Sequence, residues 1–432
     1  MTDAESLFPR LSSRLYVLRR DNRVLYLEPE YPDWITINCR YEGIFDRFDG
    51  KHSLGDVFRF IGEHHRDESS LLVGQIDSLV KTSKIFAQDY VPNADSRHQR
   101  ESRLRYVYLT LTDACNLSCK YCYAKARNKE CTLPLETWCT FVDRLVAFSS
   151  PLTFVFTGGE PLVVPYVFEL ANHISTRGSG CILMTNGTMI ESGETAARIA
   201  GSFELTKVSL DSLSPDTSSR LRGEGTLERV LVAVGLLDEA MAEYTLLATV
   251  NSLNKEDLES LSERFDNRVA FQPLYQMGAA KSESALAISG DEYYDALART
   301  GSFRYLSSYH RNIHSYRGNP SKRCAMAQEE LSIGPHGDLF PCHMLHYPEL
   351  RVGSMLTTES VETLYDDSGV LRRLRDLTVD SIPQCKDCIV RNFCGAGCRA
   401  RLDFYRDGLD GNDSFCNFEK RLIADALLYS YG

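Results

Sequence analysis

The run Y-V-Y-L-T-L-T-D-A-C-N-L-S-C-K-Y-C spans residues 106–122 and carries the clearest chemical signal in the chain. Its first seven residues predict a buried strand over 106–112. Three cysteines follow at Cys115, Cys119 and Cys122, in a C-x3-C-x2-C spacing. Such a loop brings three thiolates to one cubane iron–sulfur cluster and leaves the fourth iron without a protein ligand. The loop follows a strand end, where α/β barrels place their chemistry.

Length, composition and charge narrow the class of protein. With 432 residues the chain is long for one core, so we expect roughly two to four domains. Its 43% hydrophobic and 25% charged residues are typical of a soluble globular protein. A formal charge of −11 and the lack of basic runs argue against a nucleic-acid partner. No segment approaches the roughly 20 apolar residues of a membrane span, and no signal-peptide core is evident, so we expect a cytoplasmic protein without a membrane partner.

Residues 1–92 form a first block with a pattern of their own. Three strands are expected there, at 15–19, 24–28 and 34–38. Ser53 then precedes one amphipathic helix as its N-cap residue, and a second amphipathic helix follows. A polar linker over 92–102 closes the block.

The second block, residues 103–280, alternates strands with amphipathic helices. Its expected strands lie at 106–112, 152–157, 181–185, 207–211, 244–250 and 269–275. Six strand–helix units in series predict an α/β fold in which a parallel sheet curls into a partial (β/α)6 TIM barrel. Residues 281–323 form a bridging region, and residues 324–432 form a third block with few periodic segments and many cysteines.

On its cysteine motif, the sequence resembles the radical SAM superfamily, and the resemblance covers most of the chain beyond residue 100. It implies that Cys115, Cys119 and Cys122 hold a [4Fe–4S] cluster that chelates S-adenosyl-L-methionine (SAM) and passes it one electron. The turn T-G-G-E-P at 157–161 follows the second expected strand. In that family such a turn lets the backbone approach the methionine amino group, because a Cβ would block the approach.

The resemblance also implies further contacts with SAM. The residues that it assigns to cofactor binding are Tyr121, Gly158, Gly159, Glu160, Asn186, Ser209, Arg222 and Leu274. Asn186 and Ser209 would bond the ribose or the methionyl carboxylate, Arg222 would pair with that carboxylate, and Leu274 would pack on adenine. The structural alternatives are a plain turn for the G-G-E-P run, a turn for Asn186, a helix cap for Ser209, a surface charge for Arg222 and a core position for Leu274.

The third block is distinguished by seven cysteines, which stand at Cys324, Cys342, Cys385, Cys388, Cys394, Cys398 and Cys416. In a reduced compartment a high cysteine count indicates metal ligation, and closely spaced thiols can serve one metal group at low loop-closure cost. A zinc ribbon is the alternative. The order resembles the cysteine-rich iron–sulfur SPASM extension of radical SAM enzymes, which implies two auxiliary clusters. One would use Cys385, Cys388, Cys394 and Cys416, and the other Cys324, Cys342 and Cys398.

The second auxiliary set has three cysteines where the family has four. Glu330 stands at the offset of the missing one, with Glu329 beside it. The fourth iron is then open, or a carboxylate or other group fills it; for Glu330 the sequence favours a capping or solvated role. The remaining cysteines, Cys39, Cys131, Cys139 and Cys181, fit no ligand spacing and are expected to be buried small hydrophobes.

His343 directly follows Cys342, where sulfatase-maturing relatives have an acidic residue. A histidine can accept the proton of a thiol near neutral pH, which makes His343 a candidate catalytic base. The alternative is a histidine that bonds the cluster or a backbone carbonyl. The missing acid argues against sulfatase maturation.

The first block resembles the RiPP recognition element, a winged-helix-like domain that captures the leader of a ribosomally made precursor peptide. We therefore expect residues 1–92 to bind a leader and an external donor, such as a flavodoxin or ferredoxin, to supply electrons. The predicted function is a radical SAM peptide maturase that installs a cysteine thioether. Carbon–carbon or ether crosslinking, formylglycine formation, and a zinc-containing peptide-binding scaffold without activity remain as alternatives.

Overall fold

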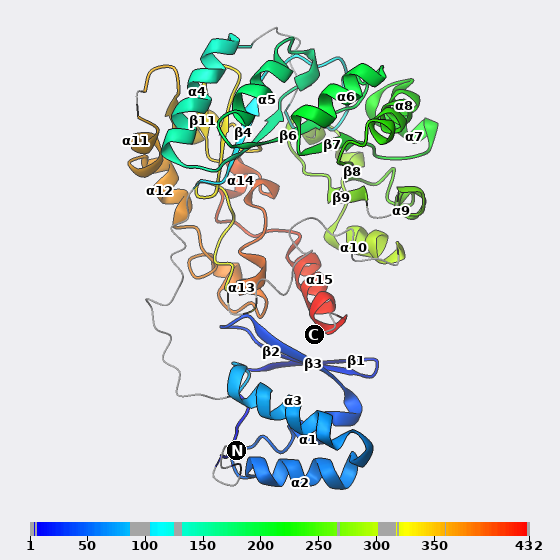
Figure 1. Cartoon of the computed structure of the whole chain (residues 1–432), viewed down its shortest axis with the longest axis vertical. Helices are drawn as coiled ribbons and strands as arrows, with labels where there is room; N and C mark the ends of the chain where they lie inside the picture. Colours follow the sequence, from blue (N-terminus) through cyan, green and yellow to red (C-terminus); the bar gives the residue numbers. More distant parts are fainter. Residues whose placement is uncertain are drawn as a thin grey trace.

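The computed structural model shows three regions along the long axis of the molecule (Figure 1). A barrel-like region lies at one end, the C-terminal region lies beside and below it, and the N-terminal domain forms the other end. The residues described are 4, 7–86, 104–124, 132–265, 268–300, 317, 319–358 and 360–429. The predicted linker and much of the bridging region lie outside these residues, so the bounds of the four predicted regions stay predictions.

The N-terminal domain is a three-stranded antiparallel sheet followed by helices, as the sequence pattern predicts. Its elements are β1 (Tyr16–Arg20), β2 (Arg23–Glu28), β3 (Asp33–Asn38), α1 (Glu42–Phe45), α2 (Leu54–His64) and α3 (Ser69–Thr82). The strands are ordered β1-β2-β3. Ser53 begins α2 through a capping box with Asp56, which satisfies otherwise free N–H groups of the first turn.

All six predicted strands of the second block are present and pair in parallel, in sequence order. They are β4 (Tyr106–Thr110), β5 (Thr153–Thr157), β6 (Gly180–Thr185), β7 (Leu205–Ser209), β8 (Tyr244–Val250) and β9 (Val269–Pro273). The helices of this block are α4 (Leu135–Phe148), α5 (Val167–Ser175), α6 (Gly193–Ser202), α7 (Pro215–Arg222), α8 (Thr226–Glu239) and α9 (Leu258–Phe265), and α10 (Gly290–Arg299) follows in the bridging region. The strand expected at 207–211 begins at Leu205 and ends at Ser209. Two residues later, the Asp211 side chain accepts the Thr249 N–H from the neighbouring strand β8.

The C-terminal region extends the same sheet, which the sequence pattern did not reveal. Its strands are β10 (Glu330–Ile333), β11 (Asp338–Phe340) and β12 (Gly353–Ser354). The full order is β12-β11-β10-β4-β5-β6-β7-β8-β9, and β10 is parallel to β4. Its helices are α11 (Val361–Asp366), α12 (Gly369–Arg375), α13 (Arg391–Cys394), α14 (Phe404–Asp407) and α15 (Cys416–Tyr429). Strands of two to four residues carry too little periodicity to be found by pattern.

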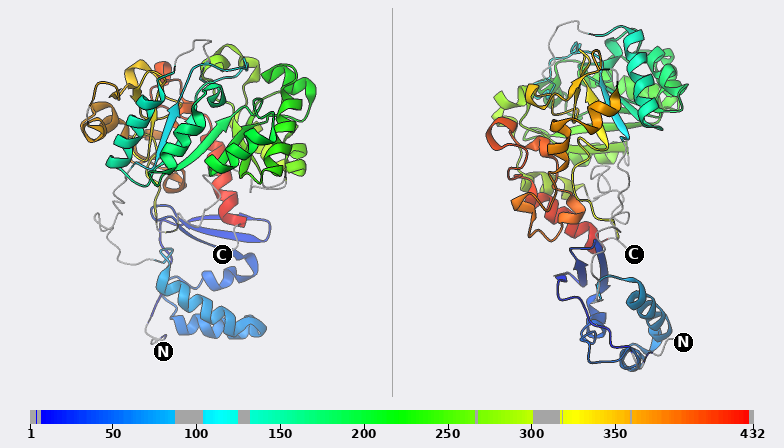
Figure 2. Two further views of the ribbon diagram at one scale, coloured as in Figure 1. Left: turned by 45° about the horizontal axis from the view of Figure 1, so that its top comes forward. Right: turned by 90° about the vertical axis from the view of Figure 1, so that its left-hand side faces the viewer.

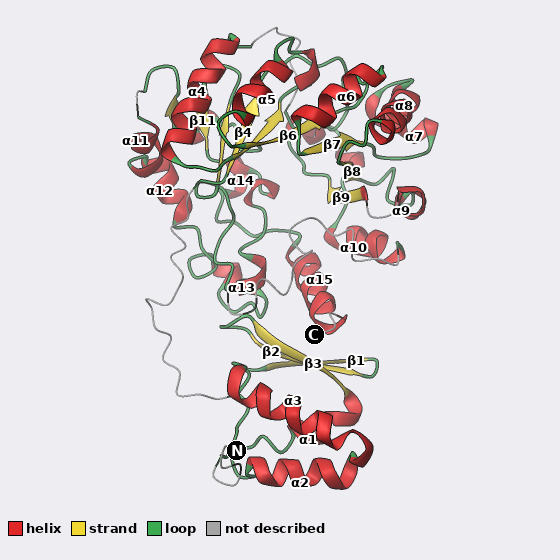
Figure 3. Ribbon diagram, in the orientation of Figure 1, coloured by secondary structure: helices red, strands yellow, loops and turns green. Residues whose placement is uncertain are grey.

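The N-terminal sheet is covered on both faces. Figure 3 shows it between its own helices α2 and α3 and the C-terminal helix α15, and both views of Figure 2 keep this arrangement. Alternation along β2 explains the two faces, because Val24 and Tyr26 pack on the domain's own helices while Leu25 and Leu27 face the other way. The second face forms an apolar cluster with the C-terminal region, made of Leu25, Leu27, Trp34, Val390, Phe393, Cys394, Ile423, Leu427 and Leu428.

Polar contacts surround this apolar interface. Arg391 donates to both carboxylate oxygens of Glu30, at 2.9 and 2.8 Å. The Thr36 hydroxyl donates to Leu427 O at 2.8 Å. Asp425 on α15 receives the guanidinium of Arg20 from β1. The N-terminal domain is thus docked through a buried core and a polar rim.

Removing apolar volume from this interface should loosen the domain. The chain has two tryptophans, Trp34 and Trp138, so in a Trp138→Phe background the emission of Trp34 reports on the interface alone. Leu427 is fully buried, and Leu427→Ala should lower the free energy of unfolding seen by Trp34 by about 2–4 kcal/mol in urea titrations. Leu71→Ala is the control, because that side chain is 64% exposed. Equal effects of the two substitutions would contradict the docking described here.

Candidate active site and cluster sites

The three cysteines of the predicted motif lie on one loop that leaves the C-terminal end of β4. Cys115, Cys119 and Cys122 are each partly buried there. Burial raises the pKa of Cys115, and it raises the pKa of Cys119 to about 11, with smaller contributions from the neighbouring thiols. A thiol with a raised pKa is protonated near neutral pH, so iron must displace these protons to bind thiolates. Three partly buried thiols on one loop are a donor set that fits an iron–sulfur cluster.

The T-G-G-E-P turn after β5 packs directly against the backbone of this cluster loop. The Gly159 N–H donates to Thr112 O at 2.8 Å, and the Glu160 N–H donates to Ala114 O at 2.9 Å. A Cβ on Gly159 would stand 2.0 Å from Ala114 O, and one on Gly158 would stand 2.4 Å from Thr112 O. These glycines are the ones that the family resemblance places beside the methionine amino group of SAM. In the structure the two glycines also lie in close contact with the backbone of the cluster loop.

A third glycine, which sequence reasoning missed, holds the other flank of the loop. Gly278 lies after β9 with φ +53°, and a Cβ there would stand 2.4 Å from both Cys122 O and Tyr123 O. The next residue, Ala279, donates its N–H to Cys122 O at 2.9 Å. The signal in the sequence was a glycine just beyond a predicted strand end, in the run M-G-A-A.

Glu160 and Asn186 connect the end of β6 to the cluster loop. The buried carboxylate of Glu160 accepts the Thr185 hydroxyl and the Asn186 N–H, both at 2.7 Å, and burial raises its pKa. The Asn186 side-chain amide donates to Asn116 Oδ1 at 2.8 Å and lies 3.8 Å from Cys115 Sγ. Both predicted residues therefore reach the cluster loop, and their contacts with SAM stay predictions.

Arg222 is buried against the carboxylate of Asp211, a residue that no sequence motif marked. Its Nε donates to Asp211 Oδ2 at 2.6 Å, and the Tyr121 hydroxyl donates to the same oxygen. Asp211 Oδ1 accepts the Thr249 N–H at 2.8 Å, which fixes the carboxylate from β8. Burial alone would lower the pKa of Arg222, but Asp211 and its neighbours raise it well above the usual value. Arg222 is thus an inward-facing cation, not the surface charge that was its structural alternative.

Ser209 and Leu274 stand at the C-terminal ends of β7 and β9, which are separated in the sheet by β8. Ser209 is the last residue of β7 and is partly buried. Leu274 directly follows β9 and packs in an apolar cluster with Tyr121 and Leu221. Their roles toward ribose and adenine remain predictions.

Four of the C-terminal cysteines surround one cavity. Cys385, Cys388, Cys394 and Cys416 all line it, together with Asp413. Burial raises the pKa of Cys385, and it raises that of Cys416 to about 11. Four thiols around one hollow fit a fully ligated cluster, and the grouping is the one that the resemblance implied.

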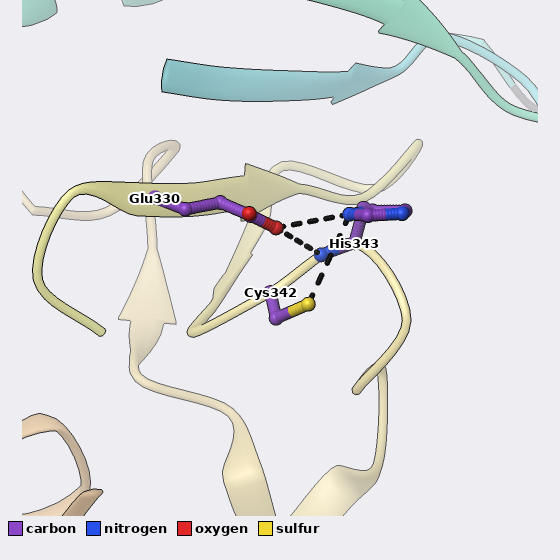
Figure 4. Close-up of side chains that lie close together, drawn as sticks. All are labelled: Glu330, Cys342 and His343. Carbon is purple, nitrogen blue, oxygen red and sulfur yellow. Dashed lines mark hydrogen bonds and ion pairs between the residues drawn. The ribbon is translucent and has the colours of Figure 1, made fainter. Parts of the chain in front are cut away.

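The other three cysteines form a second group beside β10 and β11. Burial raises the pKa of Cys324 to about 12 and that of Cys342 well above the usual range, and Cys398 adds to both shifts. Glu330 and His343 complete this group, and Figure 4 shows them beside Cys342. His343 Nδ1 lies 2.9 Å from Glu330 Oε1 and 3.8 Å from Cys342 Sγ.

The cysteines outside these groups differ in their surroundings. Cys181 on β6 is buried and Cys139 on α4 is partly buried, in keeping with a packing role. The prediction of burial is wrong for Cys39, which is exposed because it begins a short 3-10 helix just beyond β3. Cys131 lies outside the described residues.

Comparison with known families agrees with this geometry. Residues 109–265 match the radical SAM superfamily, and residues 324–389 match the SPASM iron–sulfur cluster-binding domain. The chain is a radical SAM enzyme with a SPASM domain. Its cofactors are therefore SAM, a SAM-binding [4Fe–4S] cluster and auxiliary clusters. The alternative of a zinc-containing scaffold without activity is not favoured, because the relatives are enzymes.

Curated relatives are similar over most of the radical SAM/SPASM chain. The AdoMet-dependent heme synthase of Oleidesulfovibrio alaskensis is 25% identical over 73% of this chain and 88% of its own length. The mycofactocin maturase MftC of Mycobacterium ulcerans is 24% identical over 71% of this chain and 86% of its own length.

Two solved structures share the fold. The protein anSMEcpe with bound AdoMet has a TM-score of 0.63 at 18% identity, over 75% of this chain and 99% of that one. Streptococcus suis SuiB with S-adenosylmethionine has a TM-score of 0.59 at 14% identity, over 94% of this chain and 99% of that one. In the described part of this radical SAM enzyme, no helix is long and apolar enough to cross a membrane.

Adding one methyl group at the turn against the cluster loop should empty the SAM-cluster site. Gly159→Ala places a Cβ 2.0 Å from Ala114 O, a steric clash that the cluster loop must move to relieve. We therefore expect the iron content to fall by about four atoms per chain. Gly193→Ala is the matched control, because nothing lies within 4 Å of its added Cβ. Iron and sulfide analysis after anaerobic reconstitution measures both. An unchanged iron content in Gly159→Ala would contradict the role of the turn.

Proposed function

We propose that this protein is a peptide maturase that joins a cysteine sulfur to an unactivated carbon of a ribosomally made precursor peptide. The observation that carries the proposal is an N-terminal domain docked on the radical SAM/SPASM core, with a strand, β3, that pairs on one side only among the described residues. The fold of SuiB covers 94% of this chain, a share that requires residues of the N-terminal domain. SuiB has also been solved bound to the precursor peptide SuiA, and MftC is named as a maturase.

The N-terminal domain is proposed to be a winged-helix-like domain that acts as a RiPP recognition element. Three antiparallel strands followed by helices support this reading. One face of the sheet is covered by the domain's own helices and the other by α15, so a peptide has access to an edge rather than to a face. Within the described residues, β2 is the strand neighbour of β3, which leaves the other side of β3 for an added strand.

The hydrogen-bond register of β3 shows which of its residues face outward. The Cys39 N–H donates to Asn22 O, and in an antiparallel pair such bonded positions alternate. The odd-numbered residues of β3 therefore bond β2, while Thr36 and Asn38 direct their backbone groups away from it. Trp34 O already accepts Arg317 Nη2 at 2.9 Å, so a leader strand would pair beyond that residue.

The proposed chemistry at the barrel mouth divides between the cofactors and this chain's residues. When bound, SAM and its cluster supply a 5′-deoxyadenosyl radical that removes a hydrogen atom from the peptide carbon, and an auxiliary cluster supplies an electron acceptor. Cys115, Cys119 and Cys122 would hold the SAM cluster, and the two C-terminal thiol groups would hold the auxiliary clusters. An external donor such as a flavodoxin or ferredoxin is proposed to provide the electron for SAM. A leader held on the N-terminal domain raises the local concentration of the core peptide.

His343 is proposed as the group that accepts the proton of the substrate thiol. Its ring stacks on Tyr108 with centroids 4.0 Å apart and an angle of 13° between the planes. Its Nδ1 lies against Glu330, which fixes the ring's orientation. A sulfur that has lost its proton can form the new carbon–sulfur bond, while one electron leaves the peptide.

The product identifies the reaction. Incubation with SAM, dithionite and a cysteine-containing precursor should yield a peptide lighter by two hydrogen atoms for each crosslink, together with 5′-deoxyadenosine. A thioether consumes a thiol, so iodoacetamide should label one cysteine fewer in the product than in the substrate. Mass spectrometry measures both changes. A product with all its thiols free would replace the thioether with carbon–carbon or ether bond formation, and an unchanged peptide would contradict the proposal.

The edge of β3 allows a sharper test of leader binding than truncation. Deleting residues 1–92 would expose apolar side chains of α15, whereas Thr36→Pro removes one outward N–H and spares the bonds to β2. We expect leader affinity to fall about tenfold, as the loss of one hydrogen bond predicts. SAM cleavage without peptide should not change.

Thr36→Val is the matched control for this experiment. It keeps the outward N–H and removes only the hydroxyl that bonds Leu427 O. Fluorescence anisotropy with a labelled leader measures both variants. Equal affinity for the Pro and Val variants would contradict strand addition at β3.

A further inference from the structure

Backbone hydrogen bonds join the segments that carry Cys324, Glu330 and Cys342. The Glu330 N–H donates to Ala325 O at 3.1 Å, directly after Cys324, and the Ala327 N–H donates to Pro341 O at 3.0 Å, directly before Cys342. Glu330 is also the first residue of β10 and is paired with Tyr106 on β4. Its backbone is therefore fixed by the sheet beside two of the three thiols.

The carboxylate of Glu330 points into this group. Glu330, Cys342 and His343 each offer a donor atom, and these atoms lie within 4.8 Å of one another. Figure 4 shows the three side chains converging, with Glu330 coming from β10 and the other two from the loop after β11. Both contacts from His343, through Nδ1 and the backbone N–H, fall on Oε1. Neither of these two contacts from His343 involves Glu330 Oε2.

Glu329, the residue before Glu330, has a solvated carboxylate and provides a comparison for the exposure of Glu330. The Glu329 side chain is 39% exposed and pairs with Arg105 at 3.3 Å. The Glu330 side chain is 15% exposed and faces thiols and an imidazole. The expectation of a capping or solvated Glu330 is therefore wrong. The residue begins a strand, not a helix, and its carboxylate is turned inward.

His343 fits the role of partner to this carboxylate better than that of a ligand. Its ring is held between Tyr108, on which it stacks, and Tyr123, whose ring meets it at 83°. Its Nδ1 is directed at Glu330. Ligating side chains are commonly oriented by such a second hydrogen bond.

We propose that Glu330 is the fourth protein ligand of the auxiliary cluster held by Cys324, Cys342 and Cys398, through a bond from a carboxylate oxygen to iron. Carboxylate is a harder ligand than thiolate, so this iron is held less tightly than the other three. The inference depends on the proposed grouping of these three cysteines. It does not depend on the nature of the substrate.

The test uses the full chain with Cys115, Cys119 and Cys122 replaced by alanine, which removes the SAM cluster and makes the result independent of turnover. Protein labelled with 13C-glutamate is reduced and measured by electron–nuclear double resonance. A carboxylate bonded to iron should give a 13C coupling, and Glu330→Gln in the same labelled background should lose it. Glu329→Gln, the matched control, should retain it. No coupling in the parent protein would overturn the proposal, as would a 14N coupling lost in His343→Ala.

Iron release gives a second, independent readout. Ferricyanide takes one electron from a [4Fe–4S]2+ cluster, which then releases Fe2+ and leaves [3Fe–4S]+ when one iron is weakly held. We expect Glu330→Ala to release this iron severalfold faster than the parent, and Glu330→Cys to release it severalfold more slowly. Equal rates for the parent and Glu330→Ala would overturn the proposal. If Glu330→Ala does not assemble its cluster, the 13C measurement on the parent protein decides.

Discussion

The site depends on one constraint: backbone atoms that follow two well-separated strands of the sheet, β5 and β9, hold the cluster loop from its two flanks. Ala114 O and Cys122 O accept N–H groups from the segments after β5 and β9, and on each flank a glycine permits the approach. Three thiols must each reach a different iron, and a free loop would lose much conformational entropy in placing them. Because hydrogen bonds to its carbonyl groups already fix the loop, the three thiols are positioned for the cluster at a smaller cost in conformational entropy.

The shared sheet extends this constraint to the second metal site. Because β10 pairs with β4, the hairpin that carries Glu330 and Cys342 is built on the strand that leads into the cluster loop. Aromatic contacts cross the same space, since His343 stacks on Tyr108 and meets Tyr123, the neighbour of Cys122. The N-terminal domain is joined to this frame through Asp425 on α15, which receives the Arg20 guanidinium and the Tyr294 hydroxyl. The N-terminal domain that is proposed to bind the peptide, the SAM-cluster loop and the auxiliary thiol groups are therefore parts of one connected framework.

Sequence reasoning predicted the features that have strong periodicity or cysteine spacing. The six barrel strands, the N-terminal hairpin and the residues brought to the cluster loop follow from alternation, strand order and motif. It missed β10 to β12, because such short strands are recognised only by their pairing. It also missed Asp211 and Gly278, whose roles depend on a buried cation and on a carbonyl contributed by distant parts of the chain. The inward turn of Glu330 depends in the same way on a sheet pairing that no local pattern encodes.

The central claim is that one chain holds a SAM-binding cluster and two auxiliary clusters. The most direct measurement is the iron, sulfide and zinc content of the full chain after anaerobic purification and reconstitution. Ten cysteines in three groups predict about twelve irons per polypeptide, as three cubanes of four, with matching sulfide and no zinc. About four irons together with bound zinc would contradict the account, because the C-terminal thiols would then hold structural metal rather than auxiliary clusters.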